Sequence, residues 1–167
     1  MSVIYNTSEL EKAINANDFN TVKALLDRGA SPHVYCTFGL LAKKTDNIDI
    51  LKLLIKYGFD IGEIDMETVI MEANLEVFEL ILQKYNFDPN KPIPSYYGLP
   101  LLCAIHGARL HGDTSMIKKL LDMGARPQMK YYGNTLPSTA LETLEYFMEN
   151  EGKNNLNTEI KNLIIKA

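Results

Sequence analysis

The sequence has few of the residues that build disulfide frameworks and metal centres. Its 167 residues include two cysteines and three histidines, and tryptophan is absent, which by itself excludes nothing. The cysteines, Cys36 and Cys103, lie far apart in unrelated surroundings, so they form no recognisable disulfide framework. This count favours a reducing compartment, and we expect the protein to be cytoplasmic, although a secreted effector would show the same two cysteines.

Long hydrophobic runs and blocks of positive charge are also missing. No apolar run approaches the roughly 18–20 residues that a membrane span needs, and the N-terminal MSVIYNTSELEK does not resemble a signal peptide. The 17 Lys and Arg residues are outnumbered by 21 Asp and Glu residues, for a net charge of −4. Because nucleic-acid binding relies on phosphate neutralisation, we expect no nucleic-acid partner and no membrane.

What the sequence has instead is an internal repeat. The segments AINANDFNTVKALLDRGA and AKKTDNIDILKLLIKYGF each place a glycine sixteen residues after their first alanine, at Gly29 and Gly58. A third unit, LEVFELILQKYN, ends at Asn86, and a fourth, DTSMIKKLLDMGA, contains Gly124 at the matching position. Glycine and asparagine tolerate the left-handed conformation that closes a helix, so a helix is predicted to end at each of these residues.

The second helix of each unit is predicted to carry one apolar stripe, with residues at i, i+3 and i+4. The four sets are Val22, Leu25 and Leu26; Ile50, Leu53 and Leu54; Val77, Leu80 and Ile81; and Ile117, Leu120 and Leu121. Helix starts are indicated by Asp18, Asp65 and Asp113, and by a capping box of Ser8 with Glu11. Helices of about three turns cannot bury such stripes alone, whereas stacked neighbours can. The pattern therefore predicts an all-α solenoid.

We expect one domain over residues 1–167, a length typical of a single domain. Its repeats are expected at approximately 8–36, 37–65, 66–95, 96–130 and 131–167. The fourth is longer because GARLHGDTSM is expected to add residues between its two helices. The last unit lacks a glycine-closed ending, and its helical stretches ALETLEYFMEN and TEIKNLIIKA are interpreted as a C-terminal cap.

These units resemble the ankyrin repeat family over roughly residues 8–150. The endings LLDRGASP, KYNFDPN and LLDMGARP resemble its signature LL-x-x-G-A-D-P-N, and the openings YYGLPLLCA and YYGNTLPSTA resemble its opening G-x-T-P-L-H-x-A. That opening is intact nowhere, and the distance from Gly29 to Gly58 is 29 residues, against about 33 in the family. The resemblance implies about four to five helical hairpins that bind a folded protein through a concave face and projecting loops, without catalysis. An inhibitor, an immunity protein, an adaptor or a secreted effector would all fit it.

The loops that the resemblance places at the binding edge are rich in tyrosine. They cover approximately residues 31–37, 59–65, 88–98 and 125–135, and the tripeptide Tyr-Tyr-Gly occurs twice. Tyrosine combines a large apolar face with a hydroxyl group, and it is enriched at interface hot spots. The candidate partner-binding tyrosines are Tyr35, Tyr96, Tyr97, Tyr131 and Tyr132. The alternative is that one tyrosine of each pair packs against the adjacent loop.

An acidic stretch is the second candidate feature. Residues 57–83 contain seven Asp and Glu residues and no Lys or Arg. Three of the acids, Asp60, Glu63 and Asp65, fall on a loop and are candidate contacts to a protein with a basic surface, because opposite charge steers association. The alternative is a solvated face that keeps the protein soluble. We expect the protein alone to be a monomer.

Residues suited to chemistry form no catalytic or metal-binding motif. His106 and His111 are five residues apart, whereas paired metal ligands on a helix need a spacing of four, and Cys103 lies in an apolar run. We therefore expect no enzyme activity, no metal and no cofactor. The alternative is a small hydrolase-like enzyme with a pocket at the irregular fourth repeat, formed by His106, His111, Arg109 and Asp113.

Overall fold

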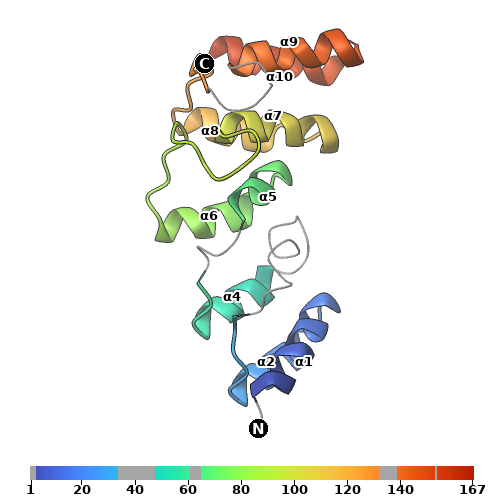
Figure 1. Ribbon diagram of the computed structural model, residues 1–167, viewed down its shortest axis with the longest axis vertical. Helices are drawn as coiled ribbons and strands as arrows, with labels where there is room; N and C mark the ends of the chain where they lie inside the picture. The colour runs from blue at the N-terminus through green and yellow to red at the C-terminus, as the bar shows by residue number, and fades with distance from the viewer. Residues whose placement is uncertain (1–2, 34–47, 61–64, 132–138, 153) are drawn as a thin grey trace. The chain divides into compact units, whose positions relative to one another are not determined.

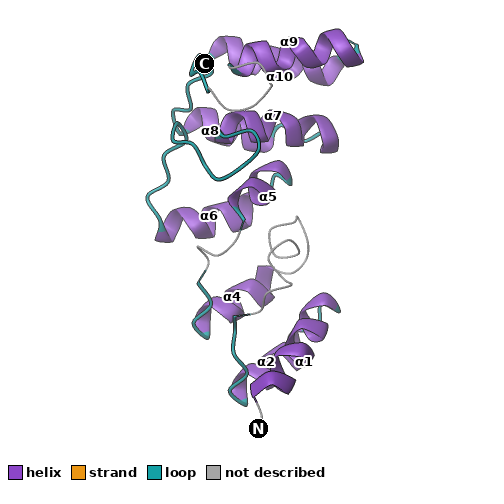
Figure 2. Ribbon diagram, in the orientation of Figure 1, coloured by secondary structure: helices purple, strands orange, loops and turns teal. Residues whose placement is uncertain are grey.

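The computed structural model describes residues 3–33, 48–60, 65–131, 139–152 and 154–167 (Figure 1). Over these ranges every regular element is an α-helix and no strand occurs (Figure 2), which confirms the all-α prediction. None of the described helices is long and apolar enough to cross a membrane. The chain divides into two compact units: unit 1 comprises residues 1–65 and 76–85, and unit 2 comprises residues 66–75 and 86–167.

Unit 1 contains α1 (Val3–Asn15), α2 (Phe19–Asp27), α4 (Ile48–Lys56) and all but the first residue of α6 (Leu75–Lys84). Helix α2 packs against both α1 and α4. The predicted stripes of α2 and α4 are buried, and they consist of Val22, Leu25 and Leu26 and of Ile50, Leu53 and Leu54. On α6 the prediction is partly wrong, because Phe78 is buried together with Val77 and Ile81, whereas Leu80 is partly exposed. The larger aromatic side chain takes the core position.

Glycine closes three helices as predicted, with the same pair of hydrogen bonds each time. Gly29, Gly58 and Gly124 have φ of 84°, 99° and 89°. The N–H of each glycine donates to the carbonyl three residues before it, and the next N–H donates to the carbonyl five residues before itself. This double closure satisfies carbonyl groups that a helix end leaves without partners, and it requires a left-handed residue that glycine supplies without steric cost.

The left-handed closure predicted at Asn86 is wrong. Asn86 does not have positive φ, whereas Asn17 and Ala73 do, at 54° and 51°. Both of these residues close a first helix, α1 or α5 (Met66–Met71), with the same two hydrogen bonds. A side chain makes this conformation costly, so a tolerant residue type does not adopt it unless the surrounding chain reverses there.

Two of the predicted helix starts also need correction. The Asp18 carboxylate accepts a hydrogen bond from the Thr21 N–H at 3.0 Å and caps α2 as predicted. Helix α1 begins at Val3, so Ser8 lies within the helix and not at its start. Asp113 accepts from the Ser115 N–H at 2.9 Å, but the N-cap position of α8 (Ser115–Asp122) is Thr114.

Unit 2 is built around α7 (Pro100–His111). Helices α5, α8 and α9 (Ala140–Glu151) pack against α7, and α10 (Asn155–Lys166) packs against α7, α8 and α9. Cys103 is fully buried in this core, as its apolar surroundings predicted. The helices predicted in the last unit are present as α9 and α10.

The extra residues of the fourth repeat lengthen a helix instead of forming a longer connection. Helix α7 has 12 residues, whereas α5 has 6, and residues 107–111 form the end of α7. Any side chain at Gly107 would overlap the backbone of Met71, so this glycine allows α5 and α7 to approach closely. The predicted insertion between the two helices is therefore wrong.

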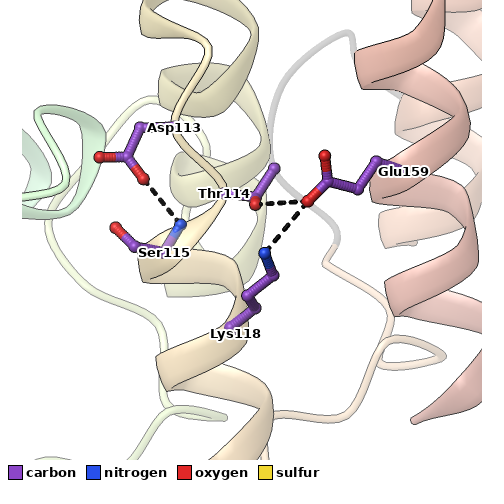
Figure 3. Close-up of polar contacts among 5 residues, drawn as sticks. All are labelled: Asp113, Thr114, Ser115, Lys118 and Glu159. Atoms are coloured by element: carbon purple, nitrogen blue, oxygen red, sulfur yellow. Dashed lines mark hydrogen bonds and ion pairs between the residues drawn. The ribbon is translucent and has the colours of Figure 1, made fainter.

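A polar link holds α10 to α8 (Figure 3). Glu159 of α10 accepts a hydrogen bond from the Thr114 hydroxyl at 2.8 Å and from the Lys118 ammonium at 3.1 Å. These two bonds hold the pKa of Glu159 below its ordinary value. Because Thr114 is buried, the link also satisfies a hydroxyl that burial would otherwise penalise.

Candidate protein-binding surface

Two loops of unit 2 lie next to each other. The first loop comprises residues 86–99 and the second loop comprises residues 123–131. The Asn90 side chain joins them, because its amide group donates to the Gly124 carbonyl at 2.9 Å and its oxygen accepts from the Arg126 N–H at 2.8 Å. Within the first loop, the Ile93 N–H donates to the Gly98 carbonyl at 2.7 Å. Backbone and side-chain bonds thus hold both loops in place.

A glycine and a tyrosine fit together where the loops meet. Gly98 has φ of 70°, and a Cβ atom added there would overlap the ring of Tyr131. Tyr131 is only partly exposed, and so is Tyr97, whereas 52% of Tyr96 is exposed. In the first Tyr-Tyr-Gly tripeptide, therefore, one tyrosine is packed and the other is open to solvent. Tyr35, Glu63 and Tyr132 lie outside the described residues.

Aromatic side chains continue from the first loop across two helices, and we call them the aromatic row. Ring centroids are 5.2 Å apart for Tyr96 and Tyr97, 4.6 Å for Tyr97 and His106, and 6.1 Å for His106 and Phe147. The row ends at Tyr146 on α9, which is 43% exposed and lies 5.7 Å from Phe147. Such ring pairs contribute more stability than their buried area alone provides. The contact of Tyr97 with His106 of α7 therefore stabilises the first loop.

A carboxylate lies beside the exposed tyrosine. Glu67 of α5 accepts a hydrogen bond from the Tyr96 N–H at 3.3 Å. Burial raises the pKa of Tyr97, and the charges of Cys103 and then Glu67 add to this effect, while the charge of Arg109 opposes it. Burial is thus the main cause of the raised pKa of Tyr97, and the Glu67 carboxylate adds to it.

The acidic candidates belong to unit 1. The Asp60 carboxylate accepts from the Lys84 ammonium at 3.0 Å and from the Tyr85 hydroxyl, so its charge is largely compensated within the protein. Asp65 is exposed, as are Glu76 and Glu79 on α6. Exposed acids are thus present in the acidic stretch, but Asp60 itself is engaged.

The residues nominated for an enzyme pocket make contacts with several parts of unit 2. His106 stacks between Tyr97 and Phe147 in the aromatic row. The guanidinium of Arg109 lies 3.4 Å from the ring centroid of Phe147, and His111 faces Glu72 at 3.9 Å. Asp113 accepts from a backbone N–H at the start of α8. Among the described residues, no group of three or more His, Cys, Asp or Glu side chains could hold a metal ion.

Sequence reasoning missed two residues of this surface, Asn90 and Glu67. Asn90 is the last residue of the ending KYNFDPN, so its place in the repeat signature was a signal that it shapes a loop. Glu67 stood out only as one of seven acids, and its contact with a residue 29 positions away has no local signal.

No model of a known protein family matches the chain, and no curated protein matches it. The resemblance to ankyrin repeats therefore stays a prediction.

Proposed function

We propose that this protein is a binding module that recognises a folded protein partner through the two loops of unit 2. The observation that carries the proposal is that rigidity and exposure occur together: Asn90 ties the loops to each other, while Tyr96 is more than half exposed. A preorganised loop loses little entropy on binding, and an exposed tyrosine supplies contact area and a hydroxyl group at the same time.

The chain is further proposed to be a degenerate ankyrin-type solenoid of about four to five repeats. Support comes from the shared closure at Gly29, Gly58 and Gly124 and from the packed helix pairs α1–α2, α7–α8 and α9–α10. The Asn90 bridge between consecutive loops is a further support. With a net charge of −4, an inhibitor or immunity protein of a basic partner fits the chain, and an effector or adaptor fits it too.

We propose no catalytic role. The first experiment tests the partner-binding surface. Tagged protein would be used to purify its partner from the source cells, and the partner would then be identified and its affinity measured. Tyr96→Ala is expected to lower that affinity by about tenfold or more, as hot-spot tyrosines do. Phe19→Ala, which removes an exposed aromatic side chain from α2, is the control and is expected to change it little.

Equal affinity of the wild type and Tyr96→Ala would contradict the proposed surface. Turnover of a small molecule by the purified protein, lost in His106→Ala, would instead favour the hydrolase-like alternative. Circular dichroism of each variant separates a binding defect from a folding defect.

A further inference from the structure

Two tyrosine rings meet almost at a right angle in the first loop. The Tyr96 and Tyr97 rings are inclined by 84°, with centroids 5.2 Å apart. Tyr97 is stacked against His106, which fixes its orientation, and Tyr96 is 52% exposed, so a partner can reach its ring. The face of an aromatic ring carries partial negative charge and attracts cations within about 6 Å of its centroid.

A carboxylate lies next to this pair of tyrosines. Glu67 bonds to the backbone of Tyr96, and its charge also acts on Tyr97. Arg109 is a nearby cation, and its guanidinium lies over the ring of Phe147, 3.4 Å from the centroid. The Glu67 carboxylate therefore places a negative charge close to the exposed Tyr96.

Unit 1 contains a similar combination of a tyrosine and a carboxylate, together with a lysine. The Lys84 ammonium lies 5.5 Å from the ring centroid of Tyr85 and 3.0 Å from the Asp60 carboxylate. Tyrosine and carboxylate together thus hold a basic side chain at one exposed position of this chain.

We infer that Tyr96, Tyr97 and Glu67, which we call the Tyr96 site, bind a cationic side chain of the partner protein. That side chain is arginine or lysine. The inference rests on the proposed function and adds the chemistry of the partner at one point of contact. Cation–π attraction supplies part of the recognition, and the carboxylate selects a positive charge over a neutral group of the same shape.

A peptide titration of the full chain tests this inference. The probe is acetyl-Gly-Gly-Arg-Gly-Gly-amide, and the matched control replaces arginine by citrulline, which keeps the planar shape and removes the charge. Nuclear magnetic resonance would follow the ring signals of Tyr96 and Tyr97. We expect weak, saturable shifts with the arginine peptide and at least about fivefold weaker binding of the citrulline peptide.

Variants show whether the Tyr96 site itself binds the peptide. Tyr96→Ala is expected to lower the affinity by about three- to fivefold, Glu67→Gln to lower it as well, and Tyr96→Phe, which keeps the ring, to preserve it. Phe19→Ala removes an exposed aromatic side chain from α2, so it is the control and is expected to leave the affinity unchanged.

Three results would contradict the inference: no binding of the arginine peptide, equal binding of the citrulline peptide, or equal losses in Tyr96→Ala and Phe19→Ala. If the partner protein still lost affinity in Tyr96→Ala, the proposed function would stand and only the cation assignment would fail. If the partner bound Tyr96→Ala as well as the wild type, the proposed function would fail first.

Discussion

Gly98 of the first loop packs against the second loop, and the ring of Tyr131 fills the space that a side chain would need. The residue also has φ of 70°, a conformation that residues with a Cβ atom adopt at a cost. Steric exclusion and backbone conformation both require glycine here. Packing between the loops thus explains the glycine of the first Tyr-Tyr-Gly tripeptide.

Gly98→Ala is therefore expected to destabilise the protein by about 1–3 kcal/mol, measured by urea denaturation. Gly124→Ala is the control, because Gly124 also has positive φ but has open space where its Cβ atom would lie. In a Tyr131→Ala background the cost of Gly98→Ala should fall to about 1 kcal/mol, the backbone contribution alone. An unchanged cost in that background would show that the ring does not cause the effect.

At the scale of secondary-structure elements, the attachment of α10 to α8 depends on the charge of Glu159. Its carboxylate accepts bonds from Thr114 and Lys118, and both lower its pKa from the ordinary value of 4.5. A carboxyl group with a lowered pKa stabilises the folded state at a pH above its ordinary pKa. That contribution is lost as the pH falls through the lowered value.

Glu159→Gln should therefore lower the urea midpoint at pH 7 by a small amount, since the group is exposed to solvent. The midpoints of the variant and the wild type should converge as the pH falls below 4.5, the ordinary pKa of Glu159. Glu149→Gln changes an exposed glutamate of α9 and is the control. A difference between Glu159→Gln and wild type that persists unchanged in acid would mean that Glu159 acts through packing and not through its charge.

At the scale of the whole molecule, the net charge of −4 and the acidic stretch predict how a basic partner associates. Exposed charges act mainly on the association rate, and salt screens them over about 10 Å at 0.1 M. Association with such a partner should therefore slow as salt is added. Asp60 is compensated by Lys84, so the exposed Asp65 is the better site for a test.

Asp65→Lys should lower the association rate by about two- to threefold at low salt and flatten its salt dependence, with little effect on the dissociation rate. Stopped-flow or surface-plasmon measurements with the identified partner would show this. Asp122→Lys reverses an exposed acid outside the acidic stretch and is the control. Equal association rates for Asp65→Lys and the wild type would show that the acidic stretch does not steer the partner.

The predictions from sequence hold where short-range rules decide the outcome. The closures at Gly29, Gly58 and Gly124 follow from the steric freedom of glycine, and the cap at Asp18 needs only the backbone three residues later. The closure predicted at Asn86 fails because asparagine tolerates the left-handed conformation but does not require it. The choice of Phe78 over Leu80 as a core residue depends on neighbours that a helical period does not reveal.

The amino-acid sequence alone was enough to predict the all-α class, the glycine closures and the apolar stripes of α2 and α4, because each depends on residues within a few positions of one another. Folding decided which tyrosine is packed and which is exposed, that Asn90 bridges the loops, and that Glu67 lies beside Tyr96. These contacts join residues about 30 positions apart, so they depend on how helices pack. That packing is a property of many side chains together, and no short motif encodes it.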